Sequence, residues 1–165
     1  MDAPLEDWRM AAEVNFWGVV HGVRAFLPTM AGGVIVNSGS KQGITNPPGH
    51  PIYNAMKAAL KSYTESLQHD LRATGAVSAH LLIPGWTMGD GPAKKPGAWT
   101  SDQVAEAMID GVSRGDFYIL CPDNDVTTAM DHRRILWAAG DMVENCPPLS
   151  RWEEAHKKAA AKACS

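Results

Sequence analysis

Apolar residues recur at helical spacing over residues 4–28, which predicts a long amphipathic helix. Pro4 suits the first turn of such a helix, where the backbone N–H groups have no partner within the helix. Gly18 and Gly22 lower helix stability, so we expect another backbone to approach the helix closely at these positions. The stripe predicted to face the core consists of Trp8, Ala11, Ala12, Asn15, Gly18, Val19, Gly22 and Phe26.

Three short apolar runs predict β-strands, at residues 33–37, 77–83 and 117–121, and Pro122 stops the last of them. The first run is continuously apolar, as a strand of a parallel sheet buried on both faces requires. One helix is predicted after each strand. The first spans residues 53–75, the second begins at the capping box at residues 100–103 and ends at Gly115, and the third spans residues 125–145. Strands that alternate with helices predict an α/β fold with a parallel sheet.

The length of 165 residues predicts a single domain. The near balance of acidic and basic residues predicts no strong electrostatic potential over its surface. Fifteen basic and eighteen acidic residues indicate neither a nucleic acid nor an anionic membrane as partner. Cys121, Cys146 and Cys164 lack CxxC spacing, so neither a disulfide framework nor a metal site is predicted. The sequence shows no signal peptide and no apolar run near 20 residues, so we expect a cytoplasmic protein.

Candidate chemistry is concentrated at Tyr53 and Lys57, four residues apart, with Ser40 upstream at the end of the first predicted strand. Positions i and i+4 share a helix face, so the lysine ammonium lies beside the phenol. A nearby cation favours the phenolate, which suits the tyrosine to act as general acid or base. Ser40 can hydrogen-bond the same substrate oxygen. By itself, a Tyr–Lys pair at this spacing is also typical of an ordinary solvated helix surface.

The surrounding residues favour a catalytic interpretation. A strand ending in Asn37-Ser38-Gly39-Ser40, a Gly/Pro loop with Gly43, and then Tyr53-Asn54-Ala55-Met56-Lys57 resembles the active-site segment of short-chain dehydrogenases/reductases. The stretch from Val14 to Gly18 resembles the family's preceding helix, and Asn15 matches the asparagine of its catalytic tetrad. The resemblance therefore implies a Rossmann-like fold with Asn15, Ser40, Tyr53 and Lys57 as catalytic residues.

The same resemblance implies a nicotinamide cofactor, NAD or NADP. Leu81-Leu82-Ile83 followed by Pro84, Gly85, Trp86 and Thr87 resembles the strand and turn that pack near the nicotinamide in this family. Tyr53 and Lys57 are the other expected cofactor contacts. Residues 86–99 are expected to form a flexible flap over the active site, and residues 125–165 a helical C-terminal extension. Substrate contacts are expected at Trp86 and in the loop at residues 42–52.

The family's glycine-rich turn, which holds the pyrophosphate at a helix N-terminus, has no counterpart in these residues. The segment from Gly85 to Gly91 spells GxxxGxG after a strand, but the prolines that follow cannot open a phosphate-binding helix. The resemblance thus implies the C-terminal, N-terminally truncated part of a Rossmann-like domain, with about three strands.

Two functional interpretations follow from this resemblance. In the first, the protein is an NAD(P)-dependent oxidoreductase for a carbonyl or secondary-alcohol substrate, and it forms a homo-oligomer through the helices that bear Asn15 and Tyr53. In the second, it is a non-catalytic remnant that serves as an oligomerisation or interaction module, because the cofactor half is missing. A serine hydrolase with Ser40 and His50 is a weaker alternative, because no GxSxG turn surrounds the serine.

Overall fold

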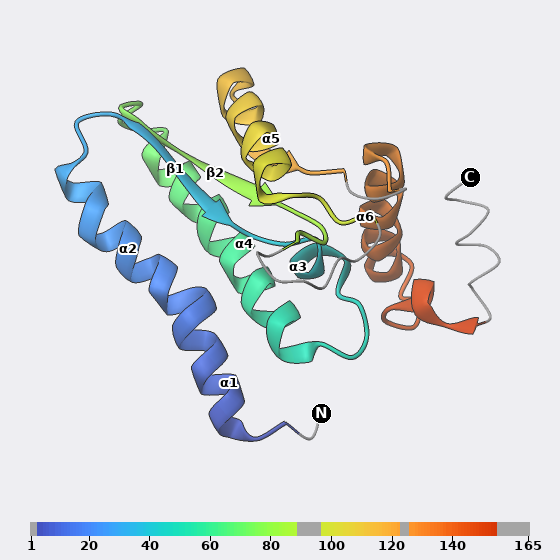
Figure 1. The fold of residues 1–165 in the computed structure, drawn as a ribbon. Coiled ribbons are helices and arrows are strands. Elements are labelled where there is room, and N and C mark those ends of the chain that lie inside the picture. Colours follow the sequence, from blue (N-terminus) through green and yellow to red (C-terminus); the bar gives the residue numbers. More distant parts are fainter. Residues whose placement is uncertain (1–2, 89–96, 123–125, 155–165) are drawn as a thin grey trace.

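The computed structural model describes residues 3–88, 97–122 and 126–154. Three parallel strands form a sheet in the order β1-β2-β3, with helices on both of its faces (Figure 1). This confirms the predicted parallel α/β, Rossmann-like fold. The elements in chain order are α1 (Leu5–Ala12), the π-helix η1 (Glu13–Trp17), α2 (Gly18–Phe26), the 3₁₀ turn η2 (Leu27–Thr29), β1 (Gly33–Ser38), α3 (Gln42–Thr45), α4 (Pro51–Leu71), β2 (Val77–Ile83), α5 (Ser101–Arg114), β3 (Tyr118–Leu120), α6 (Thr128–Val143) and the 3₁₀ turn η3 (Ser150–Trp152).

The sheet separates two apolar clusters. One joins α4 to β2 through Leu71, Val77 and Ala79, and Leu27 and Leu67 pack against it. The other lies on the opposite face, where Leu82, Ile119 and Cys121 meet Val104 and Met108 of α5. Figure 1 shows the corresponding layers, with α2 and α4 on one side of the sheet and α5 on the other. In β1 and β2, alternate residues therefore pack into two different clusters.

The burial predicted for the first strand is wrong for the start of β1. β2 is buried along nearly its whole length, whereas Gly33 and Val34 of β1 are exposed. The reason is the strand order, because β2 is the central strand and β1 lies at an edge of the described sheet. Among the described residues, no strand pairs with the other side of β1.

The residues of the first helical segment that pack on the core differ from the predicted ones, because the segment contains the π-helical turn η1. A π turn holds more residues than an α turn, so it rotates every later side chain about the helix axis. Val23 is therefore buried and Leu27 packs on the core, one position beyond the predicted Gly22 and Phe26. The expected close approach is also wrong at Gly22, where a Cβ would meet nothing within 4 Å. At Gly18 the nearest atom is the Glu13 carbonyl oxygen of the same helix.

The predicted capping box opens α5. The Thr100 hydroxyl accepts a hydrogen bond from the Gln103 N–H, and the Gln103 side chain accepts one from the Thr100 N–H. Within the described ranges, no helix is both long and apolar enough to cross a membrane.

A polar network joins the edge strand β3 to α4. The Tyr118 hydroxyl donates a hydrogen bond to Glu65, which also pairs with Lys61 at 2.6 Å. Burial and the neighbouring Glu65 carboxylate raise the pKa of Tyr118 from 10.0 to about 12. Although burial alone would raise the pKa of Glu65, its hydrogen bonds to Lys61 and Tyr118 lower it.

This network predicts a specific loss of stability at alkaline pH. The raised pKa means that folded Tyr118 keeps its proton where unfolded tyrosine has lost it. Its contribution is complete below pH 10.0 and disappears as the pH rises through about 12. Tyr118→Phe should therefore flatten the fall in the urea midpoint across this interval relative to wild type. Equal pH dependence in the two proteins would contradict the role of this bond.

Candidate active site

A cavity of about 650 Å³ opens at the carboxyl ends of β1 and β2. In open parallel sheets, ligands bind outside these strand ends. The cavity brings together nearly all the residues singled out in the sequence, although they come from three separate segments. Its lining consists of Ser38, Gly39, Ser40, Gln42, His50, Tyr53, Lys57, Pro84, Gly85, Trp86, Thr87, Ser101 and Val104.

Ser40 lies in the loop that follows β1, and the loop is held against the end of β2. The Gly39 N–H donates to the Leu82 carbonyl oxygen at 2.7 Å. The Ser40 Oγ accepts a hydrogen bond from the Gln42 N–H at 3.2 Å. This bond uses the serine oxygen as an acceptor and leaves the hydroxyl hydrogen for an oxygen atom in the cavity.

Tyr53 and Lys57 lie in the first two turns of α4, where they line the same cavity. The Lys57 Nζ is 5.5 Å from the centroid of the Tyr53 ring, so the predicted proximity of the two side chains is present. The Lys57 Nζ also donates a hydrogen bond to the Ser38 carbonyl oxygen at 2.9 Å. Burial lowers the pKa of Lys57 from 10.5, so its ammonium releases a proton more readily than that of a solvated lysine.

Buried contacts between β1 and α4 set the position of the serine relative to the tyrosine. The Asn37 side chain donates to the Thr64 hydroxyl at 3.0 Å, and that hydroxyl donates to the Leu60 carbonyl oxygen at 2.7 Å. Thr64 is fully buried. A Cβ at Gly43 would lie 2.6 Å from the Lys57 carbonyl carbon, so α3 packs directly on the backbone of α4.

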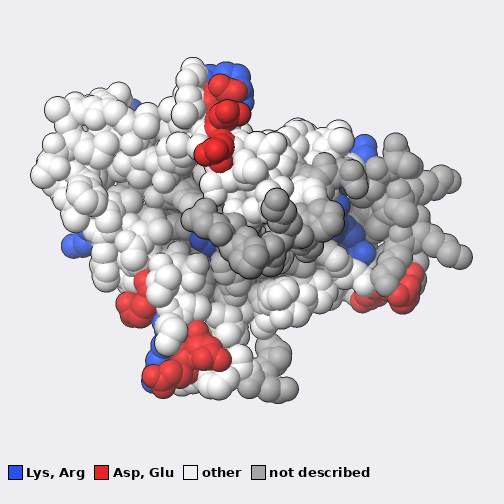
Figure 2. Space-filling view, viewed as in Figure 1, with Lys and Arg blue, Asp and Glu red and all other residues white. Residues whose placement is uncertain are grey.

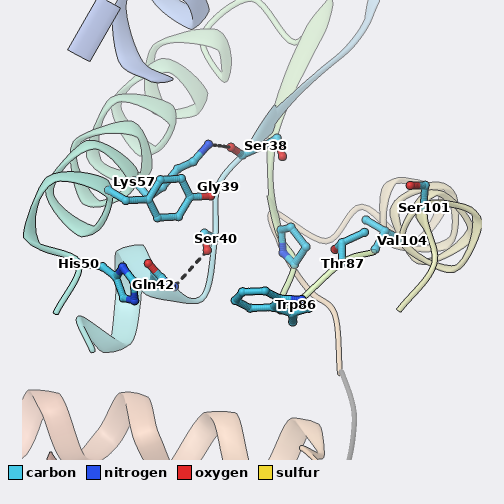
Figure 3. Close-up of a pocket in the computed structure, with 13 residues that line it drawn as sticks. Ser38, Gly39, Ser40, Gln42, His50, Lys57, Trp86, Thr87, Ser101 and Val104 are labelled. Carbon is cyan, nitrogen blue, oxygen red and sulfur yellow. Dashed lines mark hydrogen bonds between the residues drawn. The ribbon is translucent and has the colours of Figure 1, made fainter. Parts of the chain in front are cut away.

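The turn after β2 forms the opposite wall of the cavity. Figure 3 shows Trp86 and Thr87 across from Lys57, His50 and Gln42, with Ser40 between the two groups. The ends of the predicted flap are joined, because Thr87 pairs with Trp99 in a β-bridge. The middle of the flap, residues 89–96, lies outside the described residues, so its flexibility stays a prediction.

Asn15 is the predicted catalytic residue that does not line this cavity. It lies in the π-helical turn η1, which packs against α4, and its side chain donates to the Ala11 carbonyl oxygen at 3.1 Å. The role of Asn15 in catalysis stays a prediction.

Four lining residues were not predicted from the sequence, namely Ser38, Gly39, Ser101 and Val104. Ser101 and Val104 belong to the start of α5, which reaches the cavity because residues 87 and 99 pair. The capping box marked the start of this helix in the sequence, but its place beside the cavity depends on a contact that no local pattern encodes.

The family is established by comparison with known proteins. The family model for short chain dehydrogenases matches residues 1–96, which are more than half of the chain. The protein therefore belongs to the short-chain dehydrogenase/reductase family, a family of oxidoreductases.

Individual relatives agree with this assignment. SadH of Mycobacterium tuberculosis is 32% identical over 132 residues, which cover 67% of this chain and 48% of SadH. A short chain dehydrogenase/reductase from Burkholderia phymatum, solved in complex with NAD, is 27% identical with a TM-score of 0.76, over 89% of this chain and 62% of that one. A Burkholderia cenocepacia short chain dehydrogenase in complex with NADP shares the fold at 23% identity, with a TM-score of 0.71 over 88% and 60% of the two chains. The chain thus spans about half the length of SadH.

Proposed function

We propose that this protein is an NAD(P)-dependent oxidoreductase that interconverts a carbonyl compound and its alcohol. The observation that carries the proposal is the convergence of Ser40, Tyr53 and Lys57 on one cavity at the carboxyl ends of the parallel strands. Membership of the short-chain dehydrogenase/reductase family supports it. A phenol, an ammonium and a hydroxyl around one cavity can together transfer a proton to or from an alcohol oxygen.

The residues present fit the nicotinamide end of such a cofactor. The cavity volume of about 650 Å³ lies within the usual range for small-molecule and cofactor sites, about 300–1,000 Å³. Tyr53 and Lys57 on one side and the turn from Pro84 to Thr87 on the other would hold the nicotinamide and its ribose. When bound, the nicotinamide supplies or accepts the hydride. Among the described residues, no glycine-rich turn joins a strand to a helix to receive the pyrophosphate.

In this proposal Tyr53 exchanges a proton with the substrate oxygen. Ser40 orients and polarises that oxygen with its free hydroxyl hydrogen. Lys57 places its ammonium 5.5 Å from the centroid of the Tyr53 ring. The hydrogen bond from Lys57 to Ser38 ties this charge to the end of β1. Asn15 would anchor a water that relays protons past Lys57.

The wall of the cavity suggests where a substrate is selected. Trp86 offers an exposed apolar face, while Gln42 and His50 lie on the opposite wall (Figure 3). We therefore expect a carbonyl or alcohol substrate with an apolar group that packs on Trp86 and a polar group directed toward Gln42 and His50.

The first helical segment and α4 are the proposed contact with a second copy of the chain. Figure 2 shows acidic side chains near the start of α1 and a mostly uncharged surface over α2. Contiguous exposed apolar patches mark protein–protein interaction sites. The exposed apolar side chains of this segment are Leu5, Met10, Val14, Trp17 and Phe26.

Titration of tryptophan fluorescence with NADH and with NADPH tests the proposal. Trp86 lines the cavity, so cofactor binding should change the fluorescence to saturation. Light scattering on the same samples reports the oligomeric state. Saturable binding of either dinucleotide, followed by oxidation of NAD(P)H in the presence of carbonyl compounds, is the expected result. A stable dimer that binds neither dinucleotide would overturn the proposal and support a non-catalytic module.

A further inference from the structure

A buried cluster of charges lies outside the cavity, behind the loop that carries Ser40. The Lys41 Nζ is 2.6 Å from the Asp131 Oδ2, and the Arg134 Nη1 is 3.2 Å from the Asp131 Oδ1. Side-chain exposure is 12% for Lys41 and 3% for Asp131. Asp131 lies in the first turn of α6, so this ion pair joins two segments that are far apart in the sequence.

These charges are largely removed from water. Removing a carboxylate from water costs several kcal/mol, and only close opposite charges or hydrogen bonds offset this cost. Salt screens such a buried pair much less than an exposed pair. Helix α6 is therefore joined to residue 41 by a largely buried ion pair.

The backbone of Lys41 forms hydrogen bonds to two different segments beside the cavity. Its N–H donates to the Pro84 carbonyl oxygen at 3.1 Å, which joins the serine loop to the turn after β2. Its carbonyl oxygen accepts from the Ile44 N–H at 3.1 Å and from the Thr45 N–H at 2.9 Å, which begins α3. The Thr45 hydroxyl donates to the same oxygen at 3.0 Å. A shift of Lys41 would therefore move Ser40, its direct neighbour in the chain.

We propose that Asp131 is a positioning residue, which holds Lys41 and thereby fixes Ser40 in the geometry that the reaction requires. Helix α6 contributes no residue to the lining of the cavity. Through Asp131 and Lys41 it nevertheless keeps Ser40 in position. This inference rests on the proposed function. A misplacement of about 1 Å at a reacting group costs about 10²-fold in rate, so a distant anchor of this kind has a measurable effect.

Two single variants remove the link from opposite ends. Asp131→Asn removes the negative charge. Lys41→Met removes the ammonium but keeps an apolar side chain of similar length, and Asp131 then keeps its ion pair with Arg134. Asp141→Asn is the matched control on the same helix, since the hydrogen bonds that the Asp141 carboxylate accepts come from Ser150. Each variant is measured as the full chain by amide hydrogen exchange of residues 40–46 and by steady-state kinetics.

Both single variants should exchange the amides of residues 40–46 about tenfold faster than wild type, because the loop opens locally. The value of kcat should fall about tenfold, with the KM for the dinucleotide nearly unchanged, since α4 and the turn after β2 keep their contacts. The double variant should lose no more than the worse single variant, because the two changes break one link. Asp141→Asn should change the stability of α6 and neither of these two readouts.

Folded single variants with wild-type exchange at residues 40–46 and wild-type kcat would overturn the inference. An equal effect of Asp141→Asn would also overturn it, because the effect would then follow from the stability of α6 alone. If wild type shows no turnover with any carbonyl compound, the proposed function fails instead. In that case hydrogen exchange alone decides whether Asp131 holds the loop.

Discussion

Replacing Tyr53 by phenylalanine is expected to abolish turnover while the fold and dinucleotide binding persist. The change removes one oxygen atom from a side chain at the mouth of the cavity and leaves the packing of α4 unaltered. The lost group is the proposed proton donor and acceptor. Loss of a general acid or base lowers kcat by about 10²- to 10⁴-fold.

Tyr63→Phe is the matched control for this experiment. Tyr63 lies on the same helix but faces Phe16, with the two ring centroids 6.0 Å apart, and it does not line the cavity. It should keep wild-type kcat. Dinucleotide affinity is measured for both variants by tryptophan fluorescence. Full activity of Tyr53→Phe in a preparation whose wild type is active would end the proposed role of the phenol.

Gly43→Ala is expected to lower both stability and activity, because the position has no room for a side chain. An added Cβ would lie 2.6 Å from the Lys57 carbonyl carbon, 2.7 Å from its oxygen and 2.9 Å from the Ala58 nitrogen. These are backbone atoms of α4, so they cannot rotate away as a side chain can. Overpacking of this kind costs about 1–3 kcal/mol of unfolding free energy.

Activity should fall for a separate reason, since α3 must move away from α4 and take Ser40 with it. Urea unfolding and kcat measured on the same sample separate the two effects. Gly140→Ala is the control, because a Cβ there meets nothing within 4 Å. In a helix this change should raise stability by about 0.5–1 kcal/mol. A Gly43→Ala protein as stable and active as wild type would contradict the close contact of α3 with α4.

The limits of prediction from sequence are clearest in the first helix. Spacing placed Gly22 and Phe26 on the buried stripe, whereas Val23 and Leu27 are the residues that pack. The shift arises from the π turn at residues 13–17. Such a turn has no strong sequence signal, and helical periodicity assumes a constant number of residues in each turn. By contrast, the capping box of α5 was predicted correctly because its hydrogen bonds are local.

The sequence by itself determined the order of the three strands and the four long helical segments, the family, and the grouping of Tyr53 with Lys57, because these depend on neighbours along the chain or within one helical turn. Only the tertiary structure decided that α5 and the turn after β2 complete the cavity, and that Asp131 holds the residue next to Ser40. These contacts join segments far apart in the sequence, and they form because packing of the whole domain lowers its free energy. The pattern of neighbouring residues in any one segment therefore does not predict them.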